Sequence, residues 1–136
     1  MTPFTLRIVT PYGVAYEGQA EELIVRTTTG DMGFLARHYN AVAPLGMGRA
    51  TIVIDGKKRY AACIGGMVSV VNGEVSLVPT TFEWAENIDI ARAEASKNRA
   101  EKVLADKTAT NTEIALAEAR LKRALVRTRV ATYKPK

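Results

Sequence analysis

The fold of the first part of this chain is decided by residues 52–78, IVIDGKKRYAACIGGMVSVVNGEVSLV, in which two turn signals lie between apolar runs. Asp55-Gly56 follows Ile52-Val53-Ile54, and Asn72-Gly73 has valine-rich runs on both sides. Both dipeptides supply the positive-φ residues that tight hairpin turns need. The stretch therefore predicts antiparallel strands joined by short turns.

The residues before this stretch are also typical of short strands. Phe4, Leu6 and Ile8 alternate with polar residues, which is the period of two expected of a half-buried strand. Leu23-Ile24-Val25 predicts another strand, and we interpret Gly30-Asp31-Met32-Gly33 as a turn, because no helical pattern follows it. Many short strands separated by turns predict a sandwich or barrel with antiparallel pairing.

From about Asn87 the pattern becomes helical, because alanine becomes frequent and glycine disappears. Asn87 is predicted to cap a helix over residues 88–105, with Asp89 in its first turn facing the positive end of the helix dipole. Thr110-Asn111-Thr112-Glu113 has the spacing of a capping box and predicts a second helix over residues 111–131. The short connection predicts an antiparallel pair.

The two helices are predicted to meet along small side chains. The expected contact residues are Ala91, Ala95 and Val103 on the first helix and Ile114, Ala117, Leu121, Ala124 and Leu125 on the second. Alanine lets two helix axes approach closely but buries little apolar area, which contributes roughly 25 cal/mol per Å². The hairpin is therefore expected to be weakly held and able to separate or dock again.

The net charge of the chain lies at its end. Residues 113–136 hold seven Lys/Arg and two acidic residues, a balance of +5, and the other 112 residues hold twelve of each sign, a balance of zero. Arg120, Arg123 and Arg127 form one stripe beside the apolar contact residues, and Lys122 and Arg129 lie along the other flank. A basic helix of this kind indicates an acidic or anionic partner.

The first helix also carries arginines on one face, which Ile88, Arg92, Ala95 and Arg99 share. Closing the hairpin can therefore bring arginines from both helices to one groove, where an anion would relieve their repulsion and where Arg suits bidentate phosphate binding. The alternative is a solvated charged face, whose helix pairs contribute only about 0.2–0.5 kcal/mol each. Spacing alone favours this alternative and leaves both open.

The sequence gives no support for catalysis or for a metal site. His38 is the only histidine, so it has no partner for a metal pair or a relay, and we interpret it as a hydrogen-bonded loop residue. Cys63 is the only cysteine, which excludes an intrachain disulfide, and its apolar neighbours predict a buried thiol. The sequence contains no apolar run of about 18 residues, so no membrane span is predicted. Nucleic-acid binding is an alternative of a different class, but the basic helix lacks aromatic residues before Tyr133.

Three stretches together point to a known family. They are Ile8-Val9-Thr10-Pro11 with Val14, Tyr16, Glu17 and Gly18; Thr27-Thr28-Thr29-Gly30-Asp31-Met32-Gly33-Phe34-Leu35-Ala36-Arg37-His38 continuing to Val42-Ala43-Pro44-Leu45; and Ile88-Asp89-Ile90-Ala91-Arg92-Ala93, which fits the pattern Ile/Leu-Asp-x-x-Arg-Ala. In this order and at these separations the chain resembles the epsilon-subunit family of bacterial F-type ATP synthases over essentially its full length. It departs from the family pattern at Asn40, where proline is common, and around Gly65-Gly66, which usually follow Ser and precede Phe.

The resemblance implies an α+β chain with a ten-stranded β-sandwich over residues 1–84 and a mobile antiparallel two-helix hairpin over residues 87–133. It implies a non-catalytic central-stalk subunit that couples proton transport to ATP synthesis at the cytoplasmic face of the bacterial membrane. The sandwich would contact the gamma subunit and the ring of c subunits. The hairpin would extend into the alpha/beta catalytic head and inhibit ATP hydrolysis, without direct insertion into the membrane.

The resemblance also implies three sets of site residues. Those at a regulatory ATP site, with ATP bound alone or with magnesium and with no obligatory cofactor, are Glu83, Ile88, Asp89, Arg92, Ala93, Arg99, Arg123 and Arg127. Contact with the c ring or gamma is expected at Asp31, His38 and Met67. Contact with an acidic segment of the beta subunit is expected at Arg120, Lys122, Arg123, Arg127 and Arg129. The alternative is a purely structural hairpin with no ATP sensing.

Overall fold

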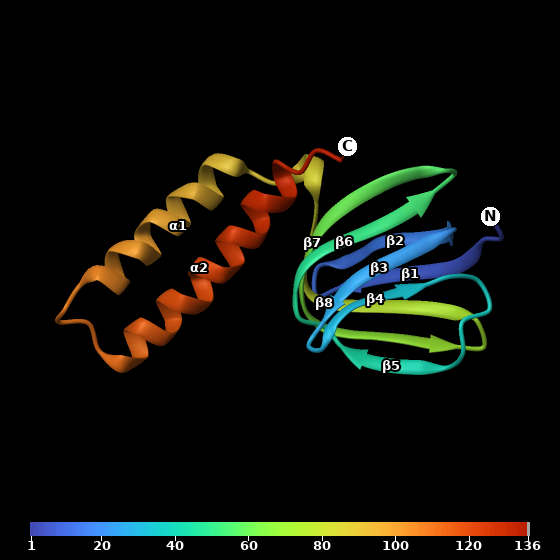
Figure 1. Ribbon diagram of the computed structural model, residues 1–136, viewed down its shortest axis with the longest axis horizontal. Helices are drawn as coiled ribbons and strands as arrows, with labels where there is room; N and C mark the ends of the chain where they lie inside the picture. Colours follow the sequence, from blue (N-terminus) through green and yellow to red (C-terminus); the bar gives the residue numbers. More distant parts are fainter. Residues whose placement is uncertain (136) are drawn as a thin grey trace. The chain divides into compact units, whose positions relative to one another are not determined.

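The computed structural model describes residues 1–135. They form two compact units, and the boundary lies between Trp84 and Ala85 (Figure 1). The first unit is built of strands and the second of helices. No helix within the described residues is long and apolar enough to cross a membrane.

The first unit is a β-sandwich formed by one continuous sheet of eight strands. The strands are β1 Phe4–Thr10, β2 Gly13–Ala20, β3 Glu22–Thr27, β4 Gly30–Phe34, β5 Ala41–Pro44, β6 Met47–Ile54, β7 Lys57–Val71 and β8 Glu74–Trp84. Their order is β2-β1-β8-β7-β6-β3-β4, and β5 pairs with β7 outside this path. Neighbours are antiparallel except β1 and β8, which are parallel.

The expectation of ten antiparallel strands is therefore wrong in number and in one pairing. β7 is 15 residues long and pairs with β6 over its first half and with β5 over its second, so one bent strand serves both parts of the sandwich. Gly65 and Gly66 bend it at φ values of 68° and 94° while it stays paired with β8. β1 and β8 are the first and last strands of the sandwich, so no tight turn joins them and their pairing is not constrained to be antiparallel.

Both predicted hairpin turns form. Asp55-Gly56 joins β6 to β7 with φ values of 51° and 74°, and Asn72-Gly73 joins β7 to β8 with φ values of 51° and 78°. These left-handed backbones are those that two-residue turns require. The predicted turn at Gly30–Gly33 is wrong, because these residues belong to β4 and the turn lies at Thr28-Thr29. The alternation of exposed and covered residues in this glycine-rich run ends at Phe34, which is buried in the core.

One apolar core holds the sandwich together. Leu6, Ile8, Leu23, Ile52 and Leu77 are among its fully buried members and come from four different strands. Cys63 lies in the same core at 2 % exposure, which confirms the prediction of a buried thiol. Burial raises the pKa of this thiol to about 12, so it stays protonated and unreactive at neutral pH.

The second unit consists of a 3-10 turn, η1 Ala85–Asn87, and two antiparallel helices, α1 Ile90–Ala105 and α2 Asn111–Ala131. α1 is capped by Asp89 and not by Asn87 as predicted. The reason is that Ile88 N donates to the Ala85 carbonyl within the 3-10 turn, so the chain first becomes extended at Asp89, with φ −81° and ψ 98°. α2 has the predicted capping box, in which Glu113 N donates to Thr110 Oγ1 at 3.1 Å and Thr110 N donates to Glu113 Oε1 at 3.3 Å.

The contact residues of α1 differ from the prediction. Ala93 and Ala100 are buried, whereas Ala91 and Ala95 are exposed, because a displacement of two residues turns a side chain by about 200° around a helix. Alanines occur all around α1, so their presence did not identify one face. On α2 the predicted Ala117 and Ala124 are buried, and Ile114, Leu121 and Leu125, like Val103 of α1, are half-buried.

Candidate functional site

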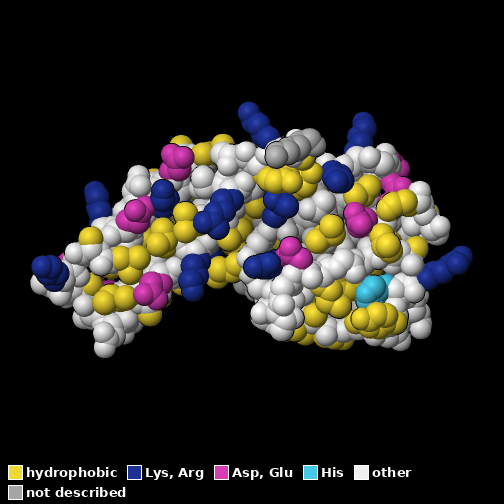
Figure 2. All heavy atoms as spheres, in the orientation of Figure 1, with side chains coloured by type: hydrophobic (Ala, Val, Ile, Leu, Met, Phe, Trp, Pro, Cys, Tyr) yellow, Lys and Arg dark blue, Asp and Glu magenta, His cyan; other side chains and the backbone are white. Residues whose placement is uncertain are grey.

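Charge distinguishes the two units of the chain. Residues 1–84 carry seven Lys/Arg and seven Asp/Glu, whereas residues 85–136 carry twelve Lys/Arg and seven Asp/Glu. The sandwich is therefore neutral, and the whole +5 belongs to the helical part. On the face shown in Figure 2, Lys and Arg side chains lie among apolar ones along the helical unit. The candidate site for an anionic partner is thus this unit.

The basic residues of α2 are mostly open to solvent. Arg120, Lys122, Arg123 and Arg129 are exposed, and Arg127 is half-buried. No carboxylate within residues 1–135 forms an ion pair with the four exposed side chains. They can therefore meet acidic side chains of another protein without first breaking an internal pair.

Of the eight residues expected at a nucleotide site, four are not arginines, and each of these four has a place in the fold. Glu83 belongs to β8 of the sandwich, while the other seven lie in the helical unit. Ile88 and Ala93 are buried, at 8 % and 0 % exposure. The carboxylate of Asp89 accepts a hydrogen bond from Arg92 N at 3.0 Å as the cap of α1.

The arginines of the same set have different positions along the hairpin. Arg92 and Arg99 are exposed on α1, and Arg123 is exposed on α2. Because the helices run antiparallel, the first turn of α1 with Arg92 lies beside the last turns of α2, where Arg123 and Arg127 lie (Figure 1). Arg99 is about two turns nearer to the α1–α2 connection. The hairpin thus offers arginines from both helices at the end where α1 begins.

The residues expected to contact other subunits lie in two places on the sandwich. Asp31 is in β4, next to the Thr28-Thr29 turn, and pairs with Arg26 at 3.3 Å. Thr28 N donates to the carbonyl of Pro44, which is the strand partner of Met67, so Asp31 and Met67 are near the same end. Asp31 therefore lies in a strand and not in the predicted turn, and its carboxylate pairs with Arg26 of the neighbouring strand β3.

His38 lies beyond the other end of β4, in the connection to β5. Its Nδ1 is 2.7 Å from the carbonyl oxygen of Tyr39, and its ring stacks on that of Tyr39 with centroids 4.3 Å apart. The prediction of a hydrogen-bonded loop residue is confirmed. Asn40, where the family commonly has proline, uses its side-chain oxygen to accept a hydrogen bond from Asn72 N at 2.8 Å, which ties this loop to the β7–β8 turn.

An exposed apolar row on the sandwich was missed by sequence reasoning. Met67, which is 44 % exposed, lies between Pro44 of β5 and Val78 of β8 in the strand register, and all three side chains are exposed. Val42 on β5 is also exposed. These residues are up to 36 positions apart in the chain, Val42 to Val78, so only the register of three strands reveals the row.

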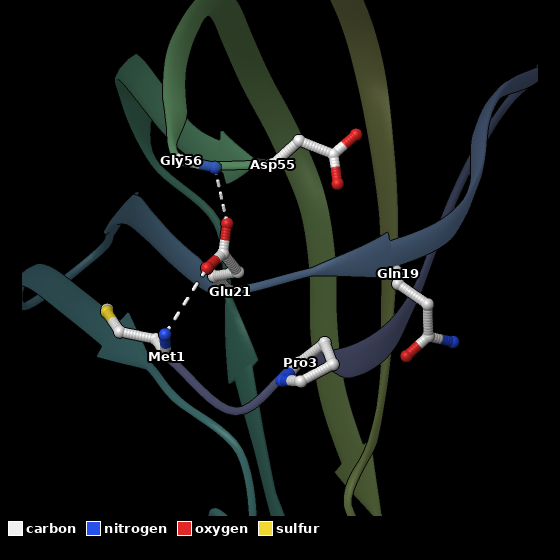
Figure 3. Close-up of a pocket in the computed structure, with 6 residues that line it drawn as sticks. All are labelled: Met1, Pro3, Gln19, Glu21, Asp55 and Gly56. Carbon is white, nitrogen blue, oxygen red and sulfur yellow. Dashed lines mark hydrogen bonds and ion pairs between the residues drawn. The ribbon is translucent and has the colours of Figure 1, made fainter.

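Two shallow cavities of about 290 and 300 Å³ lie near the start of the chain, and Figure 3 shows the first. Both include Met1 and Glu21 in their lining. The Glu21 carboxylate accepts a hydrogen bond from Gly56 N and lies 3.6 Å from the Met1 amino group. Neither cavity contains a residue of the three predicted sets. Within residues 1–135 there is also no group of three or more His, Cys, Asp or Glu that could hold a metal ion.

Comparison with known proteins agrees with this two-unit arrangement. Residues 3–85 match the beta-sandwich domain of the ATP synthase delta/epsilon chain, and residues 86–132 match its long alpha-helix domain. The structure is similar to a chain of the Euglena gracilis mitochondrial ATP synthase, from a cryo-EM structure of its OSCP/F1/c-ring, with a TM-score of 0.78 at 21% identity over 90% of this chain and 77% of that chain. It is also similar to a chain in the central stalk/c-ring structure of the Tetrahymena thermophila mitochondrial enzyme, with a TM-score of 0.62 at 14% identity over 94% of this chain and 96% of that chain. At these identities the two likenesses show the fold.

Sequence relatives are closer. The ATP synthase epsilon chain of Caldanaerobacter subterraneus subsp. tengcongensis is 44% identical over 95% of this chain and 94% of its own length. That of Ruminococcus albus is also 44% identical, over 98% of this chain and 100% of its own length. The chain therefore belongs to the family of ATP synthase epsilon chains.

Proposed function

We propose that this chain is a non-catalytic central-stalk subunit of a bacterial F-type ATP synthase, where it helps to couple proton transport to ATP synthesis at the cytoplasmic face of the membrane. The observation that carries the proposal is the match of both family domains, in order, over residues 3–132. The origin of the two structural neighbours, in F1/c-ring and central stalk/c-ring assemblies, supports it.

The sandwich supplies two contact areas in this proposal. The end with Asp31 and the exposed row around Met67 contacts the c ring, and the loop of His38, beyond the other end of β4, contacts the gamma subunit. Exposed apolar side chains gathered on one surface favour protein contact, because burying them releases water from apolar area. The exposed ion pair of Asp31 with Arg26 adds polar groups beside the apolar row in the first area.

The helical unit is the regulatory part in this proposal. Its four exposed basic side chains on α2 match an acidic segment of a beta subunit in the catalytic head, and such a contact would resist the rotation that ATP hydrolysis drives. A seam of small side chains supports this role, because alanine contacts bury little area and cost little to open.

The test of the regulatory role is removal of residues 87–136 from the chain in the assembled enzyme. We expect the complex to assemble and its ATP hydrolysis to rise, because the sandwich with both proposed contact areas remains. Replacement of Arg120, Lys122, Arg123 and Arg129 by Gln is the matched variant, since it keeps the helices and removes their charge. If both variants hydrolyse ATP at the rate of the unaltered enzyme, the inhibitory role is wrong.

The helical unit also binds ATP as a regulatory ligand in this proposal. The support is the position of Arg92 beside the last turns of α2, where Arg123 and Arg127 lie, because guanidinium groups form strong charge-assisted hydrogen bonds with phosphate. Arg92→Ala and Arg127→Ala are each expected to weaken MgATP binding by the isolated chain by about tenfold or more in calorimetry. Lys107→Ala, in the exposed α1–α2 connection, is the control and should bind like the unaltered chain. Absence of binding by the unaltered chain would favour the alternative, a purely structural hairpin.

A further inference from the structure

The two tight turns of the sandwich have similar backbones, but their glycine amides are in different states. Gly56 N donates to the carboxylate of Glu21 (Figure 3), whereas Gly73 N donates to no acceptor within residues 1–135. The backbone nitrogen that follows an Asn or Asp is the atom that can attack the side-chain carbonyl carbon of that residue. We propose that Asn72 is a site of spontaneous deamidation, whereas Asp55 in the equivalent turn is protected by Glu21.

Deamidation at Asn72 needs only the chain itself and water. The backbone nitrogen of Gly73 bonds to Cγ of Asn72, the bond from Cγ to the side-chain nitrogen breaks, and that nitrogen leaves as ammonia with the amide proton of Gly73. Water then opens the resulting five-membered imide ring at one of its two carbonyl carbons, and the ring nitrogen takes back a proton. One opening yields Asp, and the other yields isoaspartate, in which the main chain runs through the side-chain methylene. Both products carry a carboxylate that is charged at neutral pH.

The surroundings of Asn72 leave both reacting groups accessible. Asn72 is exposed, and its carboxamide makes no hydrogen bond with another residue in the range 1–135. A Cβ atom built on Gly73 would meet nothing within 4 Å, so the space beside the attacking nitrogen is open. The other four asparagines are followed by residues whose side chains crowd that nitrogen, namely Ala41, Ile88, Arg99 and Thr112. Asn72 is therefore expected to react first.

One hydrogen bond restrains the reaction. Asn72 N donates to Oδ1 of Asn40 at 2.8 Å, which ties the turn to the connection of residues 35–40 between β4 and β5. The imide ring can close only when the backbone leaves the turn conformation, so the rate follows local opening of the hairpin tip. Loss of one such hydrogen bond should raise the rate about two- to tenfold. Asn40, which stands where the family commonly has proline, is thus the residue that slows the modification.

The isoaspartate product should in turn release the connection of residues 35–40. Its lengthened main chain does not fit the two-residue turn, whose left-handed backbone at Asn72 and Gly73 has φ values of 51° and 78°. Asn72 N then loses its place opposite Asn40. In the proposed function this connection carries His38 to the gamma subunit, so the modified chain would present that contact in a looser form. Only this last consequence depends on the proposed function.

The experiment incubates the full chain at mildly alkaline pH and follows every asparagine by peptide mapping with mass spectrometry, in which elution separates Asp from isoaspartate. A peptide of residues 68–77 gives the rate of the same sequence without the fold. In the folded chain Asn72 should convert before the other four asparagines. Asn40→Ala should convert at Asn72 about two- to tenfold faster. Asn40→Asp, which keeps an acceptor oxygen, should convert at the rate of the unaltered chain.

The turn at Asp55 supplies the matched test. Isoaspartate should form there in Glu21→Ala, which frees Gly56 N, and not in Glu21→Gln, which keeps an acceptor oxygen. Hydrogen exchange of residues 35–40 then measures the release of the connection. It should be faster in the isoaspartate form than in the fresh chain, and unchanged in Asn72→Asp, which has the new charge but the normal main chain.

Four results would overturn parts of the inference. If Asn72 stays intact while the peptide converts completely, or if another asparagine converts first, Asn72 is not the site. If Asn40→Ala and Asn40→Asp convert alike, their hydrogen bond does not restrain the turn. Equal formation of isoaspartate at Asp55 in Glu21→Ala and Glu21→Gln would show that the bond to Gly56 N gives no protection. Equal exchange in the isoaspartate form and the fresh chain would refute the release of residues 35–40. Each measurement uses the isolated full chain, so none depends on binding to the gamma subunit.

Discussion

Gly66 and Gly73 both adopt left-handed backbone on or beside β7, but only one of them is also crowded. A Cβ atom on Gly73 would meet nothing within 4 Å, whereas one on Gly66 would overlap the Val78 carbonyl oxygen and lie 2.7 Å from Pro79 Cα. Gly73→Ala is expected to cost about 1–2 kcal/mol for the left-handed backbone alone. Gly66→Ala should cost about 1–3 kcal/mol more because of the overlap. Urea unfolding of the two variants measures the difference, and equal losses would contradict this account of the bend in β7.

The buried thiol of Cys63 makes stability depend on pH in the alkaline range. Burial raises its pKa from 9.0 to about 12, so above pH 9 the unfolded chain loses the thiol proton while the folded chain keeps it. The folded state then becomes less stable by about 1.4 kcal/mol per pH unit until the pH reaches the folded pKa. The free energy of unfolding, measured at about pH 8 and about pH 10, should fall less in Cys63→Ala than in the unaltered chain. Parallel decreases in the two proteins would show that the thiol ionises equally in both states.

At the scale of elements, α2 depends on its capping box for a defined start. Thr110→Ala removes the acceptor of the hydrogen bond from Glu113 N and should destabilise the helix by about 0.5–2 kcal/mol. Thr112→Ala is the matched control, because Thr112 is exposed in the same turn and makes no side-chain hydrogen bond with another described residue. Far-UV circular dichroism during heating should show a lower midpoint for the first variant only. The same midpoint for both would mean that packing alone fixes the start of α2.

Elements that depend on neighbouring residues in the chain could be predicted, and those that depend on distant contacts could not. The capping box and the two hairpin turns are local, and each appears where its dipeptide or tetrapeptide predicts it. β4 contains two glycines, so it looks like a turn until its pairing with β3 is known. The seam of α1 was misplaced because alanine occurs on every side of that helix. The 3-10 turn at Ala85–Asn87, which delays the start of α1, also has no clear local signal.

At the scale of the whole molecule, the charge pattern was visible in the sequence, but the roles of the site residues were not. The motif from Ile88 to Ala93 identified the family, yet one side chain of the motif proves to cap a helix, two are buried, and one arginine is exposed. Sequence position cannot separate these roles, because they are set by the angle of each side chain around α1. The exposed row through Met67 likewise required the register of β5, β7 and β8.

The division of charge and core between the two units predicts that residues 1–84 fold without the helices. Every member of the sandwich core, from Phe4 to Leu77, lies within this range, as does Trp84, which packs against the core. The seven basic and seven acidic residues of the range balance. Trp84, the only tryptophan, keeps its edge contact with Phe82 at 5.0 Å and the Arg59 guanidinium 3.7 Å above its ring. The fragment should therefore unfold cooperatively in urea with the tryptophan fluorescence midpoint of the full chain. At neutral pH the fragment should also flow through a cation-exchange column without binding. The full chain, whose pI is about 9.5, should bind to the same column. A fragment without a cooperative transition would show that the sandwich needs the helical unit to fold.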